Sequence, residues 1–162
     1  MAVKGKEPGH TYRSAAGFTL VEVLIVVSIV GILAALASTS YERYREKVRV
    51  SQAVVDIGAM STAIKLYETD ARELPGSLGE IGWGNRLDPW GRPYEYYDLG
   101  SKRGNGKARK DKKLAPLNSD FDLYSTGKDG QSKSPLVTPV SRDDVVRARD
   151  GKFIGLAKDF DP

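Results

Sequence analysis

The chain has no cysteine and a single histidine, His10, close to its first residue. No disulfide can form, so any cross-link within a small domain must come from another interaction. Beyond His10 there is neither histidine nor cysteine, which excludes Ser-His-Asp and Cys-His nucleophiles and nearly all zinc sites there. No spacing of carboxylates indicates a catalytic pair. The sequence therefore predicts a protein that is not an enzyme, with no catalytic residues.

Proline is missing from residues 18–74, and the first part of this stretch is almost purely apolar. Residues 18–37 are long enough to cross a bilayer as a helix. Apolar and aromatic residues then continue at steps of three and four, which is the period of a helix face. We therefore expect one helix from about residue 18 to 72, with a transmembrane or assembly part over 18–38 and an amphipathic part over 39–74.

Two ordinary explanations of the apolar run fit incompletely. A secretory signal peptide, cleaved between Ala37 and Ser38, would have a shorter apolar core. A plain signal anchor explains the length of the run but leaves Glu22 unexplained. A charged group inside a bilayer costs on the order of 3 kcal/mol and usually has a partner.

A third explanation comes from the residues at the start of the run. Gly17-Phe18-Thr19-Leu20-Val21-Glu22, behind a basic leader, resembles the processing site of type IV pilins and type II secretion pseudopilins. The resemblance implies that a prepilin peptidase removes residues 1–17 and that Phe18 is then N-methylated. In the assembled filament, the Glu22 carboxylate would pair with the terminal amine of a neighbouring subunit, which relieves the cost of burying either charge. The alternative for Glu22 is that its side chain reaches the membrane interface.

Residues 75–162 predict a small extracytoplasmic β domain. Residues 94–97 and 121–125 are expected to be strands, 143–149 a short helix, and 151–155 a last short strand. The fold class is therefore α+β: a long N-terminal helix packed on a small antiparallel sheet with a long C-terminal loop, as in pilins. The basic segment 100–113 predicts a solvated loop, with lipid headgroups, anionic polysaccharide or DNA as alternative contacts.

Carboxylates gather around one turn of this domain. Asp120 and Asp122 come at the start of a predicted strand, Asp129 lies in the turn after it, and Asp143 and Asp144 follow a loop. Clusters of oxygen ligands on loops suit Ca²⁺, although the spacing is not that of an EF-hand. Solvated turn carboxylates are the alternative explanation.

Two further motifs narrow the resemblance to one type of subunit. Asp88-Pro89-Trp90-Gly91-Arg92-Pro93-Tyr94 and the segment 122–130 resemble motifs of the major, G-type pseudopilin of type II secretion. The resemblance implies a structural calcium ion bound by Asp122 and Asp129, with carbonyls near Ser119 and Gln131 as further ligands. Residues 131–135 and the tail after Asp143 depart from the usual pattern of this subunit.

The resemblance also implies a function and a set of partners. The chain would be a structural subunit of a type II secretion pseudopilus, assembled helically from the inner membrane with its C-terminal domain in the periplasm. Its partners would be further copies of itself, minor pseudopilins, the prepilin peptidase, the assembly platform and membrane lipid, with no nucleic acid. A type IV pilin is the first alternative, although such pilins usually close their C-terminal loop with a disulfide. A signal-anchored binding module is the second.

Overall fold

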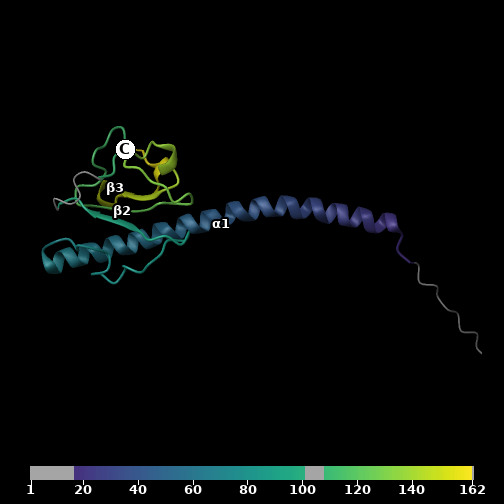
Figure 1. The fold of residues 1–162 in the computed structure, drawn as a ribbon, viewed down its shortest axis with the longest axis horizontal. Coiled ribbons are helices and arrows are strands. Elements are labelled where there is room, and N and C mark those ends of the chain that lie inside the picture. Colours follow the sequence, from purple (N-terminus) through teal and green to yellow (C-terminus); the bar gives the residue numbers. More distant parts are fainter. Residues whose placement is uncertain (1–16, 101–107, 162) are drawn as a thin grey trace, which may run out of the picture. The chain divides into compact units, whose positions relative to one another are not determined.

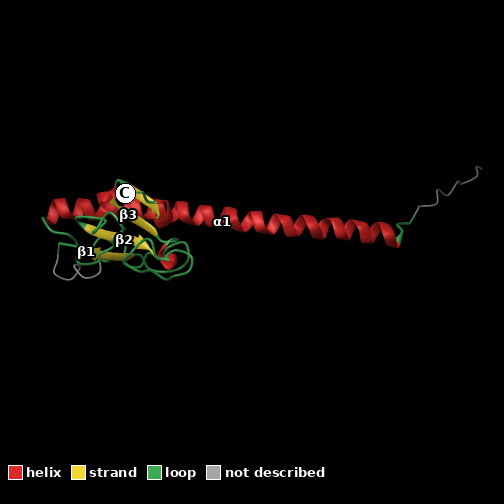
Figure 2. Cartoon of the chain, turned by 90° about the horizontal axis from the view of Figure 1, so that it is seen from above, coloured by secondary structure: helices red, strands yellow, loops and turns green. Residues whose placement is uncertain are grey.

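A computed structural model describes residues 17–100 and 108–161 of the chain (Figure 1). It has a long helix followed by a small sheet, which confirms the predicted fold class (Figure 2). The elements are α1 (Leu20–Ala71), β1 (Glu95–Asp98), β2 (Phe121–Ser125), β3 (Val145–Ala148), β4 (Phe153–Leu156) and the 3₁₀ turns η1 (Pro139–Ser141), η2 (Arg149–Gly151) and η3 (Ala157–Asp159). The strands are antiparallel in the order β1-β2-β3-β4, so each strand pairs with the next one along the chain.

The chain divides into two compact units, one up to Glu42 and one from Arg43 onward. In its described part, the first unit is the apolar portion of α1, whose large apolar side chains are all exposed. Among the described residues, α1 is the one helix long and apolar enough to cross a membrane, judged by length and composition. The subunit on its own therefore leaves this apolar surface uncovered.

The second unit has its main core between α1 and one face of the sheet. Ala53, Ile57, Met60 and Ile64 are fully buried and follow each other at steps of four, three and four residues, so they form one stripe of the helix. The sheet residues and loop residues that pack on this stripe are Phe121, Leu123, Val145, Tyr94 and Leu78. The predicted amphipathic character of this part of α1 is confirmed by its buried stripe.

The other face of the sheet carries a second, smaller core. Neighbours along the strands point to opposite faces, so Tyr124 and Val146 lie opposite the helix side. They are covered by loop residues from three segments, of which Leu117, Leu136 and Ala157 are the buried members. Both faces of β2 are thus covered, and all five of its residues are buried.

Residues 143–149 do not form the predicted short helix, and that prediction was wrong. Val145–Ala148 is strand β3, which pairs with β2 on one side and β4 on the other. Val145 belongs to the main core and Val146 to the second core. Neighbouring residues of a strand point to opposite faces, so a strand can serve both cores, whereas a single helix turn cannot. Asp150 and Gly151, with φ of 55° and 89°, then make the tight turn into β4.

A charged network links α1 to the start of β2 and to β3. The guanidinium of Arg147, which is 2% exposed, donates to both carboxylate oxygens of Asp120 at 2.8 and 2.9 Å. Lys65 on α1 donates to the same carboxylate at 2.8 Å. The Arg147 guanidinium also lies over the Phe121 ring, 3.9 Å from its centre. Asp120 therefore joins three elements of the second unit.

This network predicts a pH-dependent contribution of Asp120 to stability. Burial raises the pKa of Asp120, but hydrogen bonds from Arg147 and Lys65 outweigh it and hold the pKa below its usual range. The ionised side chain therefore stabilises the folded state at neutral pH, and this contribution is lost as the pH falls below about 4. We expect Asp120→Asn to lower the free energy of unfolding by about 3 kcal/mol at neutral pH. Below about pH 4 the free energies of unfolding of the variant and the natural chain should differ by less.

Urea unfolding of the full chain in detergent, followed by tryptophan fluorescence, measures this difference. The exposed Asp70 is the matched control, and Asp70→Asn should leave the free energy of unfolding nearly unchanged. A loss for Asp120→Asn that is the same at acidic and neutral pH would contradict the assigned role.

Candidate functional site

The first candidate site is the start of α1, where the predicted processing and assembly residues lie. Gly17 and Phe18 precede the helix, and Phe18 is 89% exposed. A Cβ added at Gly17 would meet no other group within 4 Å. The bond between Gly17 and Phe18 is thus in non-helical, uncovered backbone, which suits a peptidase substrate. The rest of the predicted leader, residues 1–16, lies outside the described residues.

Glu22 takes part in a capping box with Thr19. The backbone N–H and the hydroxyl of Thr19 both donate to Oε2 of Glu22 at 2.8 Å. In return, the N–H of Glu22 donates to the Thr19 hydroxyl at 3.2 Å. These bonds satisfy donors at the helix start and explain why α1 begins at Leu20. Sequence reasoning missed this role, although Thr-x-x-Glu before an apolar run is its usual pattern.

The second candidate site is the place where the two C-terminal motifs meet. One oxygen of Asp88 accepts the N–H groups of Trp90 and Arg92 at 3.0 and 2.8 Å, which closes the turn of the first motif. The other oxygen accepts the hydroxyl of Ser125, at the end of β2 in the second motif. The Arg92 guanidinium donates to the carbonyl of Gly127 at 2.7 Å. The two motifs therefore form one hydrogen-bonded structure.

Gly127 is required by the geometry of this second motif. Its φ is +63°, and a Cβ at this position would lie 2.3 Å from the carbonyl oxygen of Asp143. Its N–H donates to the Ser125 hydroxyl at 3.1 Å. The chain can therefore turn sharply after β2 and pass beside the residues that lead into β3 only with glycine here.

Asp122, the first predicted calcium ligand, lies fully buried in β2. One carboxylate oxygen accepts the N–H of Arg109 at 2.7 Å, and the other accepts the side-chain amide of Asn118 at 2.8 Å. Burial raises the pKa of Asp122, and these two hydrogen bonds act against that rise. Asp122 therefore already has a protein partner on each oxygen.

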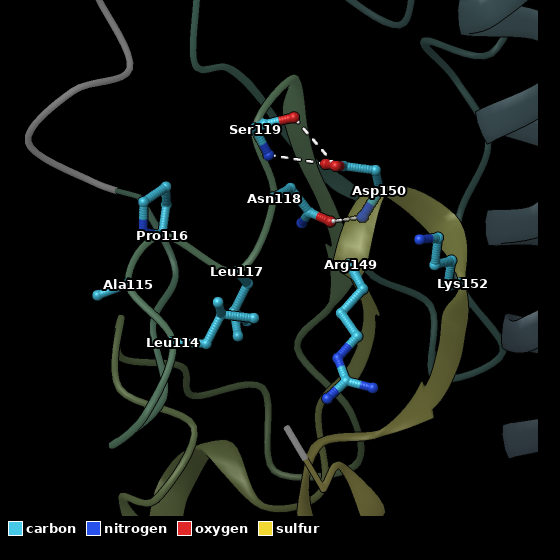
Figure 3. A pocket seen from close by; sticks show the side chains of 9 residues that line it. All are labelled: Leu114, Ala115, Pro116, Leu117, Asn118, Ser119, Arg149, Asp150 and Lys152. Atoms are coloured by element: carbon cyan, nitrogen blue, oxygen red, sulfur yellow. Dashed lines mark hydrogen bonds between the residues drawn. The ribbon is translucent and has the colours of Figure 1, made fainter.

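The residues of the other predicted ligands make hydrogen bonds through their N–H and side-chain groups. Ser119 donates its N–H and its hydroxyl to the Asp150 carboxylate at 2.7 and 3.0 Å (Figure 3). A carboxylate oxygen of Asp129 accepts the N–H of Gln131 at 2.7 Å. Within the described residues, no group of three or more acidic, histidine or cysteine side chains could hold a metal ion. In this conformation both oxygens of Asp122 are taken by protein donors, so this carboxylate does not offer a ready calcium site, and calcium binding stays a prediction.

The basic segment is only partly described, because residues 101–107 lie outside the described part. Lys110 is exposed and pairs through its backbone with the C-terminal loop: its N–H donates to Ser134 at 3.0 Å, and its carbonyl accepts from Leu136 at 2.9 Å. Arg109 is 2% exposed, so the prediction of a solvated loop was wrong for this residue. Sequence alone carries no signal that one arginine of a basic run is buried.

Comparisons with known proteins place these features in context. The family model for the prokaryotic N-terminal methylation motif matches residues 12–38. A type II secretion system core protein G of Pseudomonas aeruginosa is 31% identical over 140 residues, which cover 74% of this chain and 87% of the relative. The protein of the same name from Vibrio cholerae is 30% identical, over 74% of this chain and 84% of the relative.

A fimbrial protein of Neisseria meningitidis is also similar, with 28% identity over 83% of this chain and 79% of that protein. No solved structure matches the chain.

The joined motifs predict a large effect of removing Asp88. Asp88→Ala leaves the N–H groups of Trp90 and Arg92 and the Ser125 hydroxyl without their acceptor, and Asp88 is only 4% exposed. We expect the free energy of unfolding to fall by about 3 kcal/mol. Asp88→Asn, which keeps one oxygen, should cost less. Urea unfolding of the full chain in detergent measures both losses, and equal losses for Asp88→Ala and the exposed control Asp70→Ala would refute the linkage.

Proposed function

The chain belongs to the type II secretion core protein G family, and we propose that it is the structural subunit that builds a type II secretion pseudopilus. Proteins of this family are pseudopilins and not enzymes. The observation that carries the proposal is the match to core protein G relatives over 84 and 87% of their length. The hydrogen-bonded pair of motifs around Asp88 and Ser125 supports it. Repeated addition of subunits would drive exported proteins outward.

Processing follows from membership of the family, which implies a prepilin peptidase as partner. We place the cut between Gly17 and Phe18, followed by N-methylation of Phe18. The methylation-motif match over residues 12–38 supports this position. The exposed, non-helical backbone before α1 supports it as well, because the bond is accessible there.

Localisation and assembly follow from the apolar part of α1. Before assembly this part anchors the subunit in the inner membrane as a single span, with the N-terminus cytoplasmic and the sheet-bearing unit in the periplasm. In the filament, further copies of the chain cover the same surface. The exposed apolar side chains between Leu20 and Leu36 support this proposal, because water alone does not stabilise such a surface. Minor pseudopilins and the assembly platform are the further partners.

Glu22 then has two tasks that are compatible with each other. Both hydrogen bonds from Thr19 go to one oxygen, Oε2, of the carboxylate. The second oxygen, Oε1, can accept the methylated terminal amine of Phe18 in a neighbouring subunit. The capping box would thus hold the carboxylate at the helix start in the orientation that assembly needs.

A type IV pilin is the second candidate function, favoured by the similarity to the fimbrial protein of Neisseria meningitidis over 83% of this chain. A deletion strain separates the two functions. Loss of secretion with normal surface fibres supports the pseudopilin. Loss of twitching with intact secretion would reverse the choice.

Processing gives the first prediction from this proposal. Intact-mass measurement and N-terminal sequencing of the protein from its native membrane should find a chain that starts at N-methylated Phe18. A chain that begins at Met1, or at Ser38 after signal-peptide cleavage, would contradict the prepilin pathway.

Assembly gives the second prediction. We expect Glu22→Ala to be cut and methylated normally but to abolish filament formation and export, because no carboxylate is left to neutralise the buried amine. Thr19→Ala removes the hydroxyl bonds but keeps the carboxylate and the backbone N–H that orients it, so it is the matched control and should retain most export. The readouts are exported protein in the medium and cross-linked multimers in the membrane. Normal export by Glu22→Ala would rule out the pairing.

A further inference from the structure

Arg109 is a cation buried in the loop layer that covers the second face of the sheet. Its guanidinium donates one hydrogen bond to the carboxylate of Asp144 and one to the hydroxyl of Ser132. It also lies over the ring of Tyr124, with its central carbon 4.0 Å from the ring centre. The Arg109 side chain is 3% exposed and the Asp144 side chain 0%. The pair is therefore almost completely shielded from water.

These contacts tie together segments that are far apart along the chain. Arg109 precedes β2, Tyr124 lies in β2, Ser132 belongs to the loop after β2, and Asp144 leads into β3. Ser132 also donates to Asp144 at 2.6 Å, and the Asp144 carbonyl accepts the N–H of Ala157 at 2.9 Å. The Arg109 guanidinium thus cross-links two points of the C-terminal loop, Ser132 and Asp144, beside β2.

The same arginine occupies the surroundings of a predicted calcium ligand. Its backbone N–H donates to Asp122 at 2.7 Å, on the strand face that carries Tyr124. A divalent cation that bound near the buried guanidinium would be repelled by it, because like charges repel strongly where water is excluded.

We propose that Arg109 takes the place of calcium in this chain. The Arg109 guanidinium cross-links the C-terminal loop, so the stability of the second unit does not depend on the metal. The Arg109 guanidinium supplies the positive charge that Asp144 needs and a planar set of donors for the oxygens around it. The cross-link stabilises the second unit and is independent of the proposed role in secretion.

The first test needs no variant. Thermal unfolding of the full chain in detergent is measured with excess calcium chloride and with EGTA. We expect the same midpoint in both. Calcium bound at a hundred times its dissociation constant would raise the midpoint by about 10 °C. A rise of that size in the natural chain would overturn the proposal and support the calcium prediction instead.

The second test removes the guanidinium. Arg109→Met keeps the length and apolar volume of the side chain but leaves Asp144 buried without its cation, so we expect the midpoint to fall by roughly 10 °C. Arg142→Met, at an exposed arginine of the same loop, is the matched control and should not change it. Equal midpoints for the two variants would overturn the proposal. A calcium-induced rise that appears only in Arg109→Met would support it directly.

Discussion

Carboxylates that are buried or half-buried and paired with arginine side chains are the interaction on which the second unit depends. Asp56 on α1 is 4% exposed and accepts Arg86 through both oxygens, at 3.0 and 3.1 Å. Asp120 likewise accepts hydrogen bonds from Arg147 through both oxygens, and one oxygen of Asp144 accepts a hydrogen bond from Arg109. A domain of this size without disulfides has a marginal apolar core. The ion pairs form only when the elements are correctly placed, so they help to select one packing arrangement.

The three ion pairs connect different elements, and this explains why four short strands are enough to form a stable second unit. Arg86 joins the loop after α1 to the helix, Arg147 joins β3 to the start of β2, and Arg109 joins the segment before β2 to the C-terminal loop. The second part of α1 is thereby held against the sheet. The apolar first part remains exposed and can contact lipid and other subunits, as a pseudopilin requires.

Local patterns in the sequence were sufficient for α1 and β2. The missing proline and the three- and four-residue period predicted α1, and the alternating residues of 121–125 predicted β2. Strand β3 was missed because both of its faces are buried, so it lacks the polar alternation that marks a half-exposed strand. The bond between Asp88 and Ser125 and the pair of Arg109 with Asp144 join residues more than thirty positions apart. No local pattern encodes such contacts, since the folded chain creates them.

Whether an arginine or a metal holds the C-terminal loop is measured most directly by a crystal structure of the protein grown in excess calcium chloride. The account predicts the Arg109 guanidinium on Asp144 and no ion between Asp122 and Asp129. A calcium ion coordinated by Asp122 and Asp129, with the Arg109 side chain displaced into solvent, would contradict it.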